Sequence, residues 1–250
     1  MIPTSLRIEP SQEILGATRH WLESVRTALG GEFLACYLTG SVLTQGFSPK
    51  HSKVNVLVVS RKLDGDALDA LARTLPEVRK PPHFDPLFMP QAQIARSLDS
   101  FPIEWLEIQE MHLLIEGQDV LLGLEVPRTY LRLQCEHELR SRAIQLRQAY
   151  IAQARHPDRL EPVLRASASS FATLFRTLIR LSGETPPGDA PHVIERVADL
   201  FRLDAEALLG AYLVRYTERR YRGGEVGTLY RRFLVEIERL VNAIDELRVA

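Results

Sequence analysis

A glycine followed by a serine, Gly40-Ser41, separates two apolar stretches of the chain and supplies residue types that bind phosphate. Glycine lets a backbone approach a phosphate group closely, and a serine hydroxyl donates a hydrogen bond to phosphate oxygens. Three basic side chains follow closely along the sequence, namely Lys50, His51 and Lys53. We therefore predict a phosphate-binding turn formed by Gly40, Ser41 and these three residues.

Two short apolar segments flank this turn and are predicted to be buried strands. Residues 33–38 (FLACYL) precede the turn, and residues 54–59 (VNVLVV) follow it. Apolar runs of this length, bounded by polar residues and glycines, are typical of strands that are covered on both faces. Because side chains alternate along a strand, Lys53 and Asn55 are expected to share one face of the second strand.

Amphipathic patterns predict two helices within the first 125 residues. One covers residues 11–29, where Ser11 is a plausible N-cap and the apolar residues recur at helical spacing. The other covers residues 64–75 and is capped by Asp64 or Asp66. Helices that alternate with buried strands indicate an α/β arrangement for this half.

Two further segments of the first half are predicted to be extended. In residues 83–89, Pro86 restricts the strand to the edge of a sheet because proline lacks a backbone donor. Residues 101–109 (FPIEWLEIQ) have alternating character and are predicted as a fourth strand. In a regular strand Glu104 and Glu107 would point to opposite faces.

The pattern after Pro127 is helical throughout and contains no strand signal. Proline fits the first turn of a long helix, and an apolar stripe follows it at residues Leu131, Cys135, Leu139, Ala143, Leu146 and Tyr150. Later helices are predicted from about residue 159, over 190–202 and 204–218, and around 229–247. We expect an α/β domain over residues 1–125 and an antiparallel bundle of about five helices over residues 126–250.

The strand, the Gly-Ser turn and the second strand together resemble the DNA polymerase β-like nucleotidyltransferases, in particular small bacterial members related to the kanamycin nucleotidyltransferases. Their pattern is an apolar residue, Gly, then Gly or Ser, a gap, and then Asp, apolar, Asp or Glu, apolar. Here Thr39-Gly40-Ser41 and Lys53-Val54-Asn55-Val56 reproduce the spacing. The stretch FPIEWLEIQEMHLLIEG and the helix after LEVPR resemble bacterial nucleotidyltransferase-like proteins. The resemblance implies an α+β fold, a small mixed sheet with flanking helices followed by a helical bundle.

The resemblance also implies a chemistry from which this sequence departs. In the family, two acids on one strand face hold Mg²⁺ between the nucleotide and the acceptor hydroxyl, and a third acid lies on a neighbouring strand. Lys53 and Asn55 occupy the positions of the first two acids, and no Asp or Glu lies between Glu32 and Asp64. An ammonium about 4 Å from a divalent ion is repelled by up to about 8 kcal/mol at an effective dielectric of about 20. We therefore expect that the protein has no Mg²⁺ site and does not transfer nucleotides. In place of catalysis, we expect it to bind a nucleotide at Gly40, Ser41 and Lys53 or to act as a regulatory protein.

Two alternatives remain open at this stage. The first is an active nucleotidyltransferase that moves a nucleoside monophosphate from an NTP to a small molecule or protein. Glu104 best suits its third acid, with Glu107 or Asp85 as substitutes. The second is a helical RNA-binding or nuclease module in residues 126–250.

Two features motivate the RNA-binding or nuclease alternative. Arg132 and His137 have the R-x4-H spacing of the HEPN nucleases, although spacing this loose arises easily by chance. A stretch of tyrosines and arginines over residues 216–232 is a basic, aromatic candidate for RNA binding. Packing of the tyrosines, with the arginines in solvent, is the favoured interpretation of that stretch.

Charge and cysteine content bear on partners and location. Residues 1–125 contain 11 basic and 16 acidic residues, and residues 126–250 contain 20 and 16, so an excess of positive charge lies in the helical half. We expect the partner to be a nucleotide, or else another protein or a second copy of the chain that binds through the helical bundle. Nucleic acid is a less favoured partner. Cys36 and Cys135 are predicted to be buried thiols of a cytoplasmic protein. Neither a membrane-spanning segment nor a secretory signal is expected.

Overall fold

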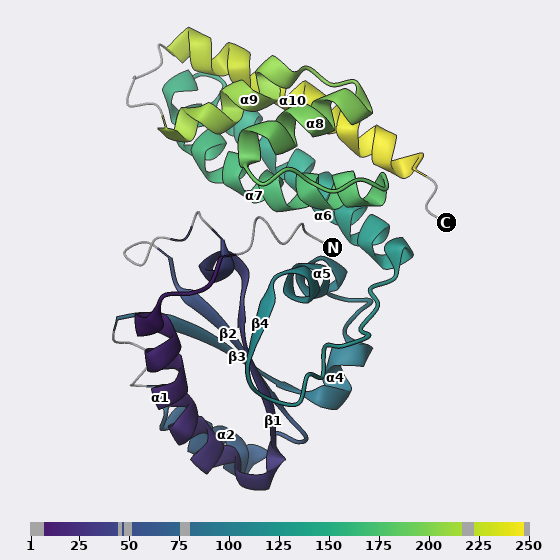
Figure 1. The fold of residues 1–250 in the computed structure, drawn as a ribbon. Coiled ribbons are helices and arrows are strands. Elements are labelled where there is room, and N and C mark those ends of the chain that lie inside the picture. The colour runs from purple at the N-terminus through teal and green to yellow at the C-terminus, as the bar shows by residue number, and fades with distance from the viewer. Residues whose placement is uncertain (1–7, 45–46, 48–51, 76–80, 217–222, 248–250) are drawn as a thin grey trace. The chain divides into compact units, whose positions relative to one another are not determined.

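Figure 1 shows the fold of the chain as a computed structural model. The structure describes residues 8–44, 47, 52–75, 81–216 and 223–247. The chain folds as two compact units, Met1–Pro127 and Arg128–Ala250. We call them the sheet unit and the helical unit.

The sheet unit is built on a mixed sheet, which the described residues form from four strands in the order β3-β2-β1-β4. The central β1 runs antiparallel to both of its neighbours, whereas β2 and β3 are parallel. The two buried strands predicted on either side of the Gly-Ser turn are thus confirmed as the middle of the sheet. The strand that contains Pro86 lies at an edge, as the missing backbone donor requires. The strands are β1 (Phe33–Thr39), β2 (Val54–Ser60), β3 (Phe84–Pro90) and β4 (His112–Gly117).

Helices cover both faces of this sheet. Figure 1 shows α1 (Gln12–Leu29) and α2 (Gly65–Ala72) along one face, with α4 (Gln91–Arg96) and α5 (Pro102–Glu110) on the other. Two apolar clusters result, one on each side of the sheet. The first contains Leu22, Val25, Cys36, Leu38, Val56 and Val58, and the second contains Tyr37, Leu57, Val59, Ile94 and Trp105. Burial on both faces explains why β1 and β2 are nearly continuous apolar runs.

The helix caps of the sheet unit follow the sequence closely. The side chain of Ser11 accepts a hydrogen bond from the amide of Ile14 at the start of α1, and Asp64 accepts one from Ala67 at the start of α2. Both N-caps were predicted, and Asp64 rather than Asp66 is the cap. These bonds satisfy amides that the first helical turn leaves without an intrahelical partner.

The prediction of a strand over residues 101–109 is wrong. These residues form α5, with Pro102 in its first turn, and the fourth strand is the following segment β4. A short apolar run of mixed periodicity does not distinguish a strand from a buried helix, and a proline followed by a glutamate is also a helix-start signal. Glu104 and Glu107 therefore lie three residues apart on a helix rather than on opposite faces of a strand.

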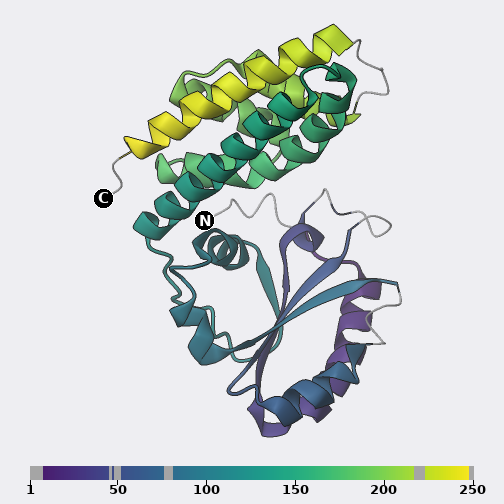
Figure 2. The ribbon, with the colours of Figure 1, turned by 180° about the vertical axis from the view of Figure 1, so that it is seen from behind.

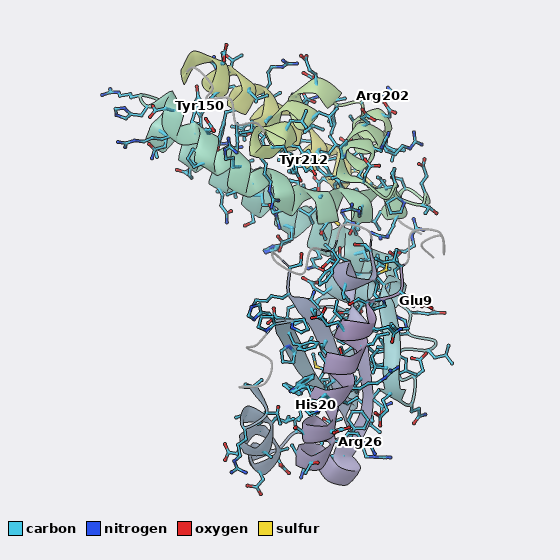
Figure 3. The ribbon with its side chains drawn as sticks, turned by 60° about the vertical axis from the view of Figure 1, so that its left-hand side comes forward. Glu9, His20, Arg26, Tyr150, Arg202 and Tyr212 are labelled. Carbon is cyan, nitrogen blue, oxygen red and sulfur yellow. The ribbon has the colours of Figure 1, made fainter. Side chains whose placement is uncertain are left out.

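Polar side chains fix the elements that cover the second face of the sheet. Trp105 of α5 donates a hydrogen bond from Nε1 to Oγ of Ser97, just after α4, over 2.8 Å. The buried Tyr37 donates to Oδ1 of Asp119 over 3.0 Å and accepts from the amide of Val120 over 2.7 Å. On the first face Arg26 of α1, labelled in Figure 3, forms an ion pair with Glu116 of β4. Each contact joins a sheet strand or a helix to a segment distant in sequence.

The helical unit consists of antiparallel helices, as predicted. In Figure 2, α10 lies alongside α6, in agreement with their extensive packing. The predicted apolar stripe of α6 is buried from Leu131 to Leu146, whereas Tyr150 is half-buried against Tyr230, with ring centroids 5.8 Å apart. The helices are α6 (Arg128–Gln153), α7 (Leu160–Leu181), α8 (Ala190–Phe201), α9 (Ala205–Leu213) and α10 (Gly223–Asp245), with short 3-10 turns at Pro157–Arg159 and Val214–Tyr216.

Two further sequence expectations concern cysteines and membranes. Cys36 and Cys135 are both buried and unpaired, and burial raises the pKa of each thiol to about 12. At this pKa both thiols are protonated and unreactive near neutral pH. Among the described residues, every helix is too short or too polar to cross a bilayer.

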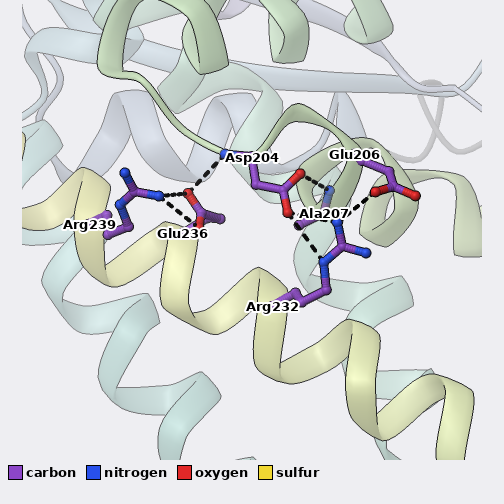
Figure 4. A network of polar contacts seen from close by, with 6 residues as sticks. All are labelled: Asp204, Glu206, Ala207, Arg232, Glu236 and Arg239. Carbon is purple, nitrogen blue, oxygen red and sulfur yellow. Dashed lines mark hydrogen bonds and ion pairs between the residues drawn. The ribbon is translucent and has the colours of Figure 1, made fainter.

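A chain of ion pairs joins α9 to α10 in the helical unit (Figure 4). Arg232 donates to Asp204 and Glu206, and Glu236 accepts from Arg239 and from the backbone amide of Asp204 over 2.9 Å. Arg232 holds the pKa of Asp204 below its usual range. Glu236 is only 6% exposed, so these two donors replace the hydrogen bonds that water would give its carboxylate.

Replacing Glu236 with alanine removes the acceptor of both the Asp204 amide and Arg239. We expect E236A to lower the free energy of unfolding by about 1.5–3 kcal/mol, the usual contribution of hydrogen bonds to a charged group. Urea denaturation followed by circular dichroism measures this change. In the control E238A, removal of the exposed pair between Glu238 and Arg147 should cost less than about 1 kcal/mol. Equal effects of the two variants would contradict the assignment.

Candidate functional site

The register of the sheet aligns four polar residues across one of its ends. Thr39 of β1 lies opposite Asn55 of β2 and His112 of β4, and Asn55 lies beside Asp85 of β3. Side chains alternate along each strand, so these four residues share the face of Tyr37 and the second apolar cluster. We call this set the polar row.

The Gly-Ser turn closes directly over the polar row. Gly40 has φ 71°, a conformation that favours glycine, and a Cβ at this position would lie 3.4 Å from Nδ2 of Asn55. Its amide donates to the carbonyl of Met111 over 3.0 Å, which joins the turn to the start of β4. This amide is therefore occupied, and phosphate donors at the turn must come from other groups. Ser41 follows as an exposed residue in a short 3-10 turn, Gly40–Leu43.

Lys53 and Asp85 form an ion pair at the edge of the polar row. Nζ of Lys53 lies 3.3 Å from Oδ2 of Asp85, and the two side chains are 64% and 57% exposed. The backbone positions them because the amide of Val54 donates to the carbonyl of His83 at the start of the parallel β2–β3 pair. An exposed pair of this kind contributes only about 0–1 kcal/mol to stability. Its presence therefore has little bearing on whether the unit folds.

The structure changes the assignment of the third acid. Glu104 was predicted as the third acid, with Asp85 as a substitute, because residues 101–109 were expected to be a strand. Asp85 is the acid on the strand beside Asn55, whereas Glu104 and Glu107 lie on α5. Of these three acids, Asp85 is therefore the one on the strand next to β2. The sequence could have indicated Asp85, because it lies in the first segment predicted to be extended after β2.

The donors in the polar row do not fit a divalent metal ion. Asp85 is the one carboxylate of the row, and it is paired with the ammonium of Lys53. Magnesium prefers oxygen ligands and usually one or two carboxylates that are available to it. Among the described residues, no group of three or more His, Cys, Asp or Glu side chains is placed to hold a metal ion. The donor set instead offers an ammonium, an amide and a hydroxyl, which are groups that bind anions.

Two of the residues predicted for this site fall outside the described structure, and one residue of the polar row was not predicted. Lys50 and His51 lie outside the residues that the structure describes. His112 was missed, because its strand was not predicted. Nδ1 of His112 lies 2.9 Å from the carbonyl oxygen of Ile108, and its ring packs edge-on to that of Tyr37 at 5.5 Å.

In the helical unit, the nuclease candidates Arg132 and His137 both lie on α6. Arg132 forms an ion pair with Glu136 and also donates to the carbonyl of Ile244, so it connects α6 to the end of α10. His137 is exposed. These contacts give Arg132 a structural explanation.

The tyrosine and arginine stretch is divided in the structure. Tyr230 is fully buried and donates to the carbonyl of Leu146, and Arg232 is paired with acids of α9. Tyr216 is 62% exposed, and its hydroxyl lies 3.0 Å from that of Tyr212, which Figure 3 labels. Arg219, Arg220, Tyr221 and Arg222 lie outside the described residues. In the described part of this stretch, Tyr230 is therefore packed in the core, as the favoured interpretation predicted. The described residues of the stretch do not form one continuous basic surface.

Comparison with known proteins indicates which fold this chain has. The sequence matches no protein-family model and no curated protein. The structure is similar to that of spectinomycin adenyltransferase AAD(9) from Enterococcus faecialis, solved with ATP and spectinomycin, with a TM-score of 0.52 at 15% sequence identity. The similarity covers 89% of this chain and 98% of that one. The chain has the polymerase β-like nucleotidyltransferase fold.

The nucleotidyltransferase fold gives the polar row its chemical context. If the Gly-Ser turn is aligned with the family pattern, Lys53 and Asn55 would fall at the two positions expected for acids; in the structure, Asp85 lies beside Asn55 on the neighbouring strand. Two acids and a third would carry a charge of −3, whereas Lys53, Asn55 and Asp85 carry a net charge of zero.

Restoring the acids should create a metal site if this alignment is right. In the double variant K53D/N55D, three carboxylates would converge at the end of β2 and β3, and we expect Mg²⁺ affinity to rise at least about tenfold. Isothermal titration calorimetry with Mn²⁺ and Mg²⁺ measures the change. Adding D85N to the double variant should remove most of the gain, because Asp85 supplies the third carboxylate. Unchanged metal affinity in K53D/N55D would show that the site lies elsewhere.

Proposed function

We propose that this protein uses a nucleotidyltransferase fold to bind a nucleoside triphosphate without transferring a nucleotide from it, and so acts as a nucleotide-dependent binding or regulatory protein. The observation that carries the proposal is the ion pair between Lys53 and Asp85, 3.3 Å apart beside Asn55 and Gly40. A cationic side chain lies where the family pattern calls for metal-binding acids.

The proposed loss of catalysis follows from what nucleotidyl transfer requires. The reaction depends on positioning and on cations that neutralise charge developing on the phosphates, with metal ions bridging the nucleotide and the protein. Here Asp85 is already paired, and neither Lys53 nor Asn55 is an anionic ligand. Lys53 supplies one positive charge but cannot coordinate both the attacking and the leaving oxygen as a metal ion does.

The proposed retention of nucleotide binding rests on the same residues. Lys53 can neutralise a phosphate directly, the exposed Ser41 has a hydroxyl donor, and Asn55 directs its amide group toward Gly40. With fewer acids than a metal-dependent site, this row repels a free triphosphate less. The neighbouring fold of AAD(9), solved with ATP, makes ATP the first nucleotide to test.

ATP should therefore bind without a divalent ion. We expect the dissociation constant measured by calorimetry in EDTA to be equal to or lower than that in Mg²⁺, because Mg²⁺ neutralises the phosphates that Lys53 would contact. K53A should weaken binding about five- to tenfold, a typical effect of losing one charge-assisted hydrogen bond. K62A is a matched control, since Lys62 forms a similar exposed pair with Asp64 beyond the opposite end of β2.

Two results would overturn the proposal. One is the absence of saturable ATP binding in EDTA by a folded protein. The other is Mg²⁺-dependent release of pyrophosphate or transfer of labelled AMP to an acceptor such as spectinomycin. That second result would favour an active enzyme, and E104Q, E107Q and D85N would then identify its third acid.

A further inference from the structure

A pocket lies between α6 and α7, wholly within the residues of the helical unit. Its volume is about 520 Å³, within the range of sites that bind small organic molecules. Leu146 and Phe171 form an apolar floor, and both are buried. Small side chains, among them Ala149 and Ala166, leave the space between the two helices open. The site described above contributes none of the described lining residues.

Arg142 is held over the floor of this pocket by an ion pair and a cation–π contact. Its Nε and Nη2 both donate to Oε2 of Glu138, over 3.3 and 3.0 Å. Its guanidinium carbon lies 5.5 Å from the centroid of the Phe171 ring, so the cation rests on the aromatic ring. Arg142 is the more buried partner, with 25% of its side chain exposed against 36% for Glu138. The ion pair thus restricts a planar group at the wall of the pocket.

The lining determines which class of ligand fits. Among the described lining residues the charged groups are Glu138 and Arg142, which neutralise one another. Gln145, Ser141 and Ser170 add hydrogen-bonding groups around the apolar floor. A neutral ligand with a planar ring would stack on the guanidinium plane and form hydrogen bonds with these polar groups.

We propose that the pocket between α6 and α7 is a second binding site, for an uncharged planar heterocycle of about nucleoside size. The fixed Arg142 guanidinium is its stacking platform, and Glu138 acts as a positioning residue that holds the guanidinium in place. This inference does not depend on nucleotide binding at Gly40 and Lys53, because the two sites share no described residue.

Calorimetry on the full-length chain in EDTA, with adenosine as the probe, tests this proposal. We expect saturable binding of adenosine and none of inositol, a non-aromatic polyol of comparable polarity. R142A should weaken adenosine binding by on the order of tenfold, as loss of one stacking partner does. R142K should not restore it, because lysine keeps the charge but lacks the plane. A166F, at an exposed position of the lining, should block binding by filling the pocket.

The chain offers a matched control on the same helix. Arg140 pairs with Glu136 in the same i, i+4 geometry but does not line the pocket, so R140A should leave adenosine binding unchanged. K53A should also leave it unchanged, whereas ATP binding at the polar row should survive R142A.

Three outcomes would overturn the proposal: no adenosine binding, equal binding of inositol, or full affinity in R142A and R142K. Loss of adenosine binding in K53A but not in R142A would place the nucleoside at the Gly-Ser turn and also overturn it.

Discussion

The strand register at one end of the sheet is the constraint on which the functional interpretation depends. Because β1 pairs with β2 and β2 pairs with β3, Thr39, Asn55 and Asp85 lie side by side, and the Gly40 turn closes over them. The long side chain of Lys53, two residues before Asn55 on the same strand face, reaches Asp85 from there. In this chain the two are an ammonium and a carboxylate, 3.3 Å apart. The register of the strands thus brings opposite charges together at this end of the sheet.

This ion pair is too exposed to be explained by stability. Its side chains are more than half exposed, and pairs of this kind contribute little to the folding free energy. The sheet unit is held instead by its two apolar clusters and by contacts such as that of Tyr37 with Asp119. The charges of the polar row are therefore available to interact with a ligand. Their net neutrality favours recognition of phosphate by direct hydrogen bonds over recognition through a metal ion.

The helical unit shows how the excess of arginine is accommodated. Many of its arginines are paired with acids one helical turn away or on a neighbouring helix, which reduces the positive charge that its surface presents. Such pairs include Arg132–Glu136, Arg140–Glu136, Arg142–Glu138, Arg165–Glu161, Arg196–Glu184, Arg232–Asp204 and Arg239–Glu236. Pairing neutralises these arginines locally but leaves the net charge of this half, with 20 basic and 16 acidic residues, unchanged. Arg142 adds a contact of a different kind, because its pairing with Glu138 also fixes it on Phe171.

The sequence by itself determined the central strands, the caps at Ser11 and Asp64, the α6 stripe and the absence of any Asp or Glu between Glu32 and Asp64. These features depend on local periodicity and on residue identity, which neighbouring residues reveal. It did not determine residues 101–117, where a short apolar run suited both a strand and a helix until packing on the sheet selected α5 followed by β4. Only the tertiary structure decided that Asp85, not Glu104, stands beside Asn55, and that Arg142 lies on Phe171. Pairing between strands and packing between helices join residues that are far apart in sequence, and no local pattern encodes those distances.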